Sequence, residues 1–109
     1  MTLQDLDSAL KTLGLPVGHY EVITEEAPYI IWAEDGQAGT VRGDNRIQEQ
    51  VITGTIDYYT KTEFDPAFFL IQEKLNALDL AWRLESIQYE DETTLIHYEW
   101  VWEMSLWLA

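Results

Sequence analysis

The stretch TLIHYEWVWEM at residues 94–104 alternates between apolar and polar side chains and decides the fold class. Successive side chains of a strand point to opposite faces, so this segment predicts a half-buried strand with one aromatic and one polar face. The aromatic face comprises Ile96, Tyr98, Trp100, Trp102 and Met104, and the other face Leu95, His97, Glu99, Val101 and Glu103. Such an apolar sheet surface needs a cover, which helices elsewhere in the chain can supply.

Two segments have the spacing of amphipathic helices. The first is expected at residues 3–13, with Thr2 and Asp5 at the spacing of a capping box. The second is expected to start where Asp65 offers a side-chain cap and Pro66 takes the first helical position. Their apolar stripes are Leu3, Leu6, Leu10 and Leu13 in the first helix and Phe68, Ile71, Leu75 and Leu78 in the second.

The remaining regular segments read as strands. They are HYEVI at 19–23, YIIWAE at 29–34, a long strand at 47–60, a strand at about 82–90, and the aromatic strand. Gly54, inside the long strand, indicates a bulge or a ring packed close to the backbone. The sequence therefore predicts an α+β fold in the order helix-strand-strand-strand-helix-strand-strand. The sheet is expected to have four to five mostly antiparallel strands, with both helices on one face.

The chain is expected to form a single domain over residues 1–109. A flexible loop is expected at about 35–46, because DGQAGTVRGDN is rich in glycine and poor in apolar residues. The terminal SLWLA at 105–109 is expected to be an apolar tail.

Charge excludes several classes of partner. The chain carries 20 acidic and 6 basic residues, a formal net charge of −14, so phosphate backbones and anionic membranes repel it. Cysteine is absent, which excludes disulfides and thiolate metal sites. The N-terminus lacks the pattern of a secretory signal, and the longest apolar run is too short to span a membrane.

Signals of catalysis are weak. His97, Glu99 and Glu103 share a strand face, but a catalytic metal site normally needs three well-placed protein ligands. A solvated polar face is the favoured interpretation of this trio. No phosphate-binding loop and no activated serine motif occurs. We expect no enzyme activity, no catalytic residue, no cofactor and no metal.

Contact residues are the more informative candidates. Arg42 and Arg46, which lie beside Asp44 and Asn45, bring local positive charge to an acidic chain. This charge suits pairing with the acidic surface of another copy; a solvated mobile loop is the alternative. Trp107 in the apolar tail is expected to dock either on the body of the domain or against a neighbouring subunit.

Five motifs resemble those of the small tail terminator proteins of long-tailed bacteriophages, also called tail completion or head-tail joining proteins. They are LGLPV at 13–17, YIIWAED at 29–35, GDNRIQEQ at 43–50, IDYYTKTEFDPA at 56–67 and WRLESIQYEDETTLIHYEWVWE at 82–103. The tail SLWLA departs from the family's pattern.

The resemblance implies a structural virion protein that is commonly monomeric when purified. Such proteins form a ring, usually hexameric, at the head-proximal end of the tail tube, where the ring stops tube polymerisation and meets the head connector. The implied partners are other copies of the chain, the tail tube protein and the connector protein, with assembly in the bacterial host cytoplasm. The loop from Arg42 to Arg46 would face a neighbouring subunit or the channel.

An acidic DNA mimic that inhibits a nucleic-acid-binding enzyme is the alternative function, because a net charge of −14 suits it. A mimic needs carboxylates in rows on one face, whereas here they are scattered over turns and strands. A small enzyme is the third hypothesis, and it lacks a titrating cluster in the sequence.

Overall fold

The computed structural model describes residues 1–38 and 49–107 of the 109-residue chain. It contains, in order, α1 (Leu3–Lys11), β1 (Val17–His19), β2 (Tyr29–Ala38), β3 (Glu49–Thr60), α2 (Ala67–Asn76), β4 (Ala81–Glu90) and β5 (Leu95–Trp107). The α+β fold and its element order are confirmed.

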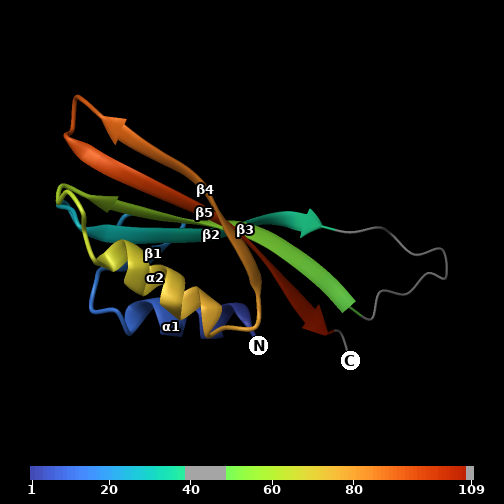
Figure 1. The fold of residues 1–109 in the computed structure, drawn as a ribbon. Helices are drawn as coiled ribbons and strands as arrows, with labels where there is room; N and C mark the ends of the chain where they lie inside the picture. Colours follow the sequence, from blue (N-terminus) through green and yellow to red (C-terminus); the bar gives the residue numbers. More distant parts are fainter. Residues whose placement is uncertain (39–48, 108–109) are drawn as a thin grey trace.

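The five strands form one sheet in the order β1-β2-β3-β5-β4. The short β1 pairs with β2 in parallel, and every other pairing is antiparallel. Both helices cover the same face of this sheet, and no helix of the described residues covers the opposite face (Figure 1). The architecture therefore has two layers, with the core between the helices and one sheet face.

The aromatic face of β5 is the centre of the core, as its alternation predicts. Tyr98, Trp100, Trp102 and Met104 are all at most 9% exposed. They meet Ile56 and Tyr58 of β3, Ile30 and Trp32 of β2, Leu6 and Leu10 of α1, and Ile71 and Leu75 of α2.

Gly54 is confirmed as a place of close approach. A Cβ atom built there would lie 2.6 Å from Cε2 of the Trp102 ring, and closer still to the Ala33 carbonyl oxygen. The neighbouring β2 strand has a register irregularity between Glu34 and Gly36, opposite this glycine. The ring of Trp102 therefore packs directly on bare backbone of β3.

The start of the first helix is confirmed, and the second helix begins at Ala67, one residue later than predicted. Thr2 Oγ1 accepts from the Asp5 backbone N–H at 3.1 Å, and Asp5 Oδ2 accepts from the Thr2 backbone N–H at 2.7 Å, completing a capping box. Pro66 has helical φ and ψ of −63° and −19°, and Asp65 Oδ1 accepts from the Ala67 N–H at 2.9 Å. Pro66 therefore occupies the N-cap position instead of the first helical position, and Asp65 bonds the first residue of α2 from the position before it.

The first strand and the loop begin and end differently from the sequence predictions. The strand predicted at 19–23 is β1 at Val17–His19, because Tyr20 has a φ of 70° and leaves the extended conformation. β2 runs on through the irregularity to Ala38, so the loop predicted at about 35–46 is wrong for residues 35–38. The rest of that loop lies outside the described residues.

The predicted tail at 105–109 is wrong over residues 105–107, which extend β5. Ser105, Leu106 and Trp107 pair with Val51, Gln50 and Glu49 of β3, which supplies a partner strand of matching length. The last two residues lie outside the described part of the chain. The first helix, predicted at residues 3–13, is α1 and ends at Lys11, so the prediction is wrong for residues 12–13.

Candidate interaction surfaces

The structure places only some of the residues singled out in the sequence. Arg42, Asp44, Asn45 and Arg46 lie outside the described residues. Trp107 is the last residue of β5 and pairs with Glu49, while the contacts of its side chain lie outside what the structure describes.

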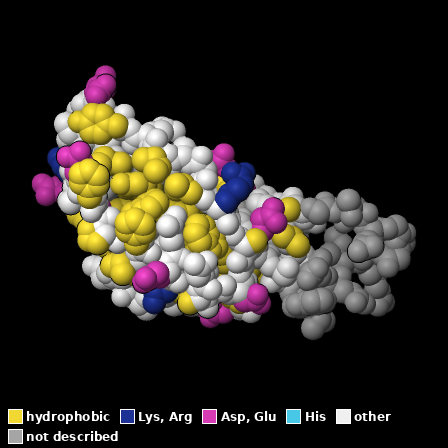
Figure 2. All heavy atoms as spheres, viewed as in Figure 1, with side chains coloured by type: hydrophobic (Ala, Val, Ile, Leu, Met, Phe, Trp, Pro, Cys, Tyr) yellow, Lys and Arg dark blue, Asp and Glu magenta, His cyan; other side chains and the backbone are white. Residues whose placement is uncertain are grey.

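An apolar groove lies between the start of α2 and the end of the β4–β5 hairpin, and we call it the hairpin groove. It has a volume of about 910 Å³. It is lined by Lys61, Glu63, Phe64, Asp65, Phe68, Phe69, Ile87, Gln88, Tyr89, Thr94, Ile96 and Tyr98. Figure 2 shows apolar surface gathered at this end of the molecule, where α2 and the hairpin lie in Figure 1.

Four large apolar side chains of the hairpin groove are exposed to an unusual degree. The exposed fractions are 92% for Phe64, 65% for Phe69, 56% for Ile87 and 60% for Tyr89. Single exposed apolar residues are common on protein surfaces, but four around one groove are typical of an interaction site.

A bulge in β4 places two of these side chains. The pairing of β4 with β5 shifts between Leu84 and Ser86, so Glu85 is an extra residue in the strand. Ile87 and Tyr89 consequently pair with Tyr98 and Ile96 and join the helix-covered face of the sheet. Ile87 and Tyr89 remain exposed on this face, although the same face is buried under the helices in the rest of the sheet. The hairpin therefore presents apolar side chains to solvent.

Asp65 holds the segment before α2 against the sheet. Its Oδ2 accepts hydrogen bonds from Tyr58 Oη at 2.6 Å and from Thr60 Oγ1 at 2.7 Å. Burial alone would raise the pKa of Asp65, but these bonds and the one from the Ala67 N–H outweigh it and lower the pKa. Next to this anchor, Phe64 has a φ of 55°, an uncommon conformation for a bulky residue, and displays its ring to solvent.

The rim of the hairpin groove is acidic. Lys61, Glu63 and Asp65 line it directly. Glu90 ends β4, and the turn that follows carries Asp91 and Glu92. One cation against five carboxylates makes this apolar surface suited to a partner segment that carries positive charge.

The helix-free face of the sheet has a different character. Tyr29, Tyr59 and His97 stack across β2, β3 and β5, with ring centroids 5.0 Å apart in the first pair and 4.2 Å in the second. Burial raises the pKa of Tyr59 to about 12, and nearby negative charge, beginning with that of Asp57, adds to the increase. His97 Nε2 lies 2.6 Å from Asp57 Oδ1.

The sequence placed His97, Glu99 and Glu103 on one face, and the structure brings only the first two close to Asp57 of β3. Glu103 pairs with Thr53 and Ala81, farther along the sheet. The sequence missed Asp57 because it is 40 residues from His97 and only the pairing of β3 with β5 unites them.

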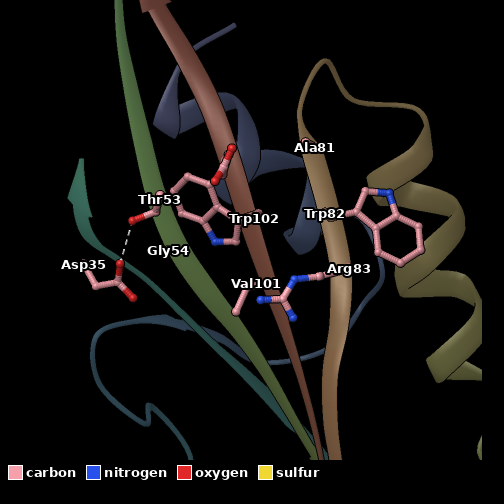
Figure 3. Close-up of a pocket in the computed structure, with 9 residues that line it drawn as sticks. Asp35, Thr53, Gly54, Ala81, Trp82, Arg83, Val101 and Trp102 are labelled. Carbon is pink, nitrogen blue, oxygen red and sulfur yellow. Dashed lines mark hydrogen bonds between the residues drawn. The ribbon is translucent and has the colours of Figure 1, made fainter. Parts of the chain in front are cut away.

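A shallow hollow of about 370 Å³ lies farther along the sheet, around Gly54 and Trp102 (Figure 3). Thr53 Oγ1 donates to Asp35 Oδ1 at 2.9 Å on one side of it, and the Arg83 side chain extends toward Val101 on the other (Figure 3). Arg83 pairs with Glu85 of its own strand, so its charge is already balanced.

Neither histidine of the described segments is positioned to activate a hydroxyl nucleophile. His19 Nε2 pairs with Glu34 Oε2 at 2.9 Å, and His97 pairs with Asp57. Within residues 1–38 and 49–107, neither imidazole bonds a serine or threonine hydroxyl, as a nucleophile–base pair requires.

No helix in the described part of the chain is both long and apolar enough to cross a membrane. The sequence matches no known protein-family profile, and it matches no curated protein at a significant level.

Proposed function

We propose that this chain is a structural virion assembly protein that caps the head-proximal end of a phage tail tube as an oligomeric ring. The ring stops tube polymerisation and allows joining to the head connector. The observation that carries the proposal is the hairpin groove, an exposed apolar surface at one end of the domain. The motif resemblance to tail terminators supports the kind of assembly.

Burial of the hairpin groove would stabilise a subunit contact. Fully burying a large apolar side chain contributes about 1.5–3 kcal/mol. Scaled by their exposed fractions, Phe64, Phe69, Ile87 and Tyr89 together offer roughly 4–8 kcal/mol. This gain is opposed by the loss of translational and rotational freedom on association, so the groove alone supports a weak contact. A chain that is monomeric alone and forms a ring on a tube end fits this balance.

The arrangement of the sheet suits ring closure. Ala38 and Glu49, between which Arg42 and Arg46 lie in the sequence, are at the end of the sheet away from the hairpin groove (Figure 1). In the proposal, these arginines pair with the acidic rim of the neighbouring copy. A contact that joins opposite ends of successive copies is heterologous, and it forms a ring when the rotation between copies closes.

The proposed partners are copies of this chain, the tail tube protein and the head connector protein, with no specific nucleic-acid binding. A net charge of −14 also suits the wall of a DNA conduit, because like charge prevents passing DNA from adhering.

Two sets of variants test the proposal. Replacing both Arg42 and Arg46 with glutamate should leave the monomer folded and abolish ring formation and tail completion. Ile87→Ser with Tyr89→Ser should do the same through the hairpin groove. The matched control is Ile23→Ser, because Ile23 is 64% exposed and does not line the groove. Tails of normal length that join heads in both variants would refute the contact assignment.

A further inference from the structure

Three side chains with metal-binding atoms meet on the helix-free face of the sheet. Asp57 of β3 and His97 and Glu99 of β5 each have one such atom within 4.8 Å of the other two. The antiparallel register produces the group, since Asp57 lies directly opposite Glu99 and Tyr59 lies opposite His97.

The two carboxylates are in an unfavourable arrangement without a cation. Like charges directly opposite each other on antiparallel strands destabilise a sheet. Their surroundings are half-buried, with side-chain exposures of 20% for Asp57 and 13% for His97, so solvent screens the repulsion only in part. Within the described residues neither carboxylate pairs with a lysine or an arginine, and His97 is the one group that can balance them.

We propose that Asp57, His97 and Glu99 bind one divalent transition-metal cation, for which zinc is the best match. The set of one imidazole nitrogen and two carboxylate oxygens consists of ligand types that zinc accepts, whereas calcium and magnesium prefer oxygen ligands alone. Three protein ligands leave one position of a tetrahedral ion for water. This site is independent of the proposed role in tail assembly.

The geometry needs little adjustment to take the ion. With zinc–ligand bonds of about 2.0–2.2 Å, the ligand atoms of a tetrahedral site lie roughly 3.3–3.6 Å apart. His97 Nε2 and Asp57 Oδ1 are now 2.6 Å apart, so the two atoms would have to separate by roughly 0.7–1.0 Å to reach that spacing. The imidazole ring is already held, since it stacks on Tyr59 with a centroid distance of 4.2 Å. The bound ion would link the two central strands.

Titration calorimetry of the metal-free protein with zinc chloride, together with thermal unfolding, tests the site. We expect one zinc ion per chain, and at a zinc concentration 100 times Kd a rise in Tm of roughly 10 °C. His97→Asn, Asp57→Asn and Glu99→Gln should each weaken zinc binding at least tenfold. With cobalt chloride, the wild type should develop the visible absorption bands of a low-coordinate site, and the three variants should not.

Two features make the test decisive. His19→Asn is the matched control, because His19 also pairs with a carboxylate, that of Glu34, but belongs to no three-ligand group in the described residues. It should keep zinc affinity unchanged. Glu99→Gln removes the like-charge pair, so without metal it should be at least as stable as the wild type. Absence of zinc binding, or equal binding by His97→Asn and the wild type, would overturn the proposal.

Discussion

Replacing Gly54 with alanine should strongly destabilise the domain, although it adds a single methyl group. The added Cβ would lie 2.6 Å from Cε2 of Trp102 and would also meet the Ala33 carbonyl oxygen. Neither neighbour can easily move. Ala33 is held in the sheet by its pairing with Thr55, and the ring of Trp102 is 1% exposed and donates from Nε1 to the Thr55 carbonyl oxygen at 3.1 Å.

The magnitude follows from two opposing effects. Overpacking of a well-packed core usually costs about 1–3 kcal/mol, and a clash against two rigid groups belongs at or above the upper end. Alanine also reduces the entropy of the unfolded chain, which returns about 0.4–1 kcal/mol. The expected net loss is about 2–4 kcal/mol, equivalent to a drop in Tm of roughly 9–17 °C.

Urea unfolding followed by tryptophan fluorescence measures this loss, because Trp100 and Trp102 are buried only in the folded domain. Gly36→Ala is the matched control on the neighbouring strand. Its Cβ would meet nothing closer than Thr53 Oγ1 at 3.6 Å, an ordinary contact, so its stability should stay within about 0.5 kcal/mol of the wild type. Equal stability of both alanine variants would refute the packing of Trp102 on Gly54.

Three further substitutions test other parts of the fold. Trp100→Ala should cost about 3–5 kcal/mol in urea unfolding, since its side chain is fully buried and a cavity would remain; near-unchanged stability would contradict its burial. Asp65→Ala should cost about 2–4 kcal/mol at pH 7, because Tyr58 and Thr60 lose their charged acceptor. The folded-state pKa of Asp65 is lowered, so this difference should hold above the ordinary pKa of about 3.9 and shrink as pH falls below it; a difference independent of pH would contradict the assignment. Thr2→Ala should cost about 1 kcal/mol through loss of the capping box. Thermal unfolding followed by circular dichroism measures this loss, and a Tm equal to that of the wild type would contradict the capping role.

Local patterns in the sequence predicted most of the fold. The alternation at residues 94–104 identified the buried face of β5, and side-chain chemistry at Thr2 and Asp65 located both helix starts to within one residue. These features depend on residues a few positions apart, so the sequence alone contains the information.

The features that the sequence missed depend on pairing between strands. The hairpin groove requires the bulge at Glu85, whose only local signal is that Trp82 and Leu84 alternate out of phase with Ile87 and Tyr89. The end of β1 depends on the left-handed conformation of Tyr20, which a non-glycine residue rarely adopts.

The cluster of Asp57, His97 and Glu99 was missed for the same reason, since only the register of β3 against β5 assembles it. Sequence spacing offered Glu103 as the third ligand, because residues that alternate along one strand share a face. The observed neighbour instead comes from the facing strand, where the residues directly opposite are the closest.

The proposal that this chain completes phage tails is tested most directly by its mass in light scattering, measured alone and then with tail tubes. A monomer that joins tube ends, or a ring of about six copies, is the expected result. A monomer or dimer that ignores tubes and instead binds a DNA-processing enzyme would contradict the assembly role and favour an acidic DNA mimic.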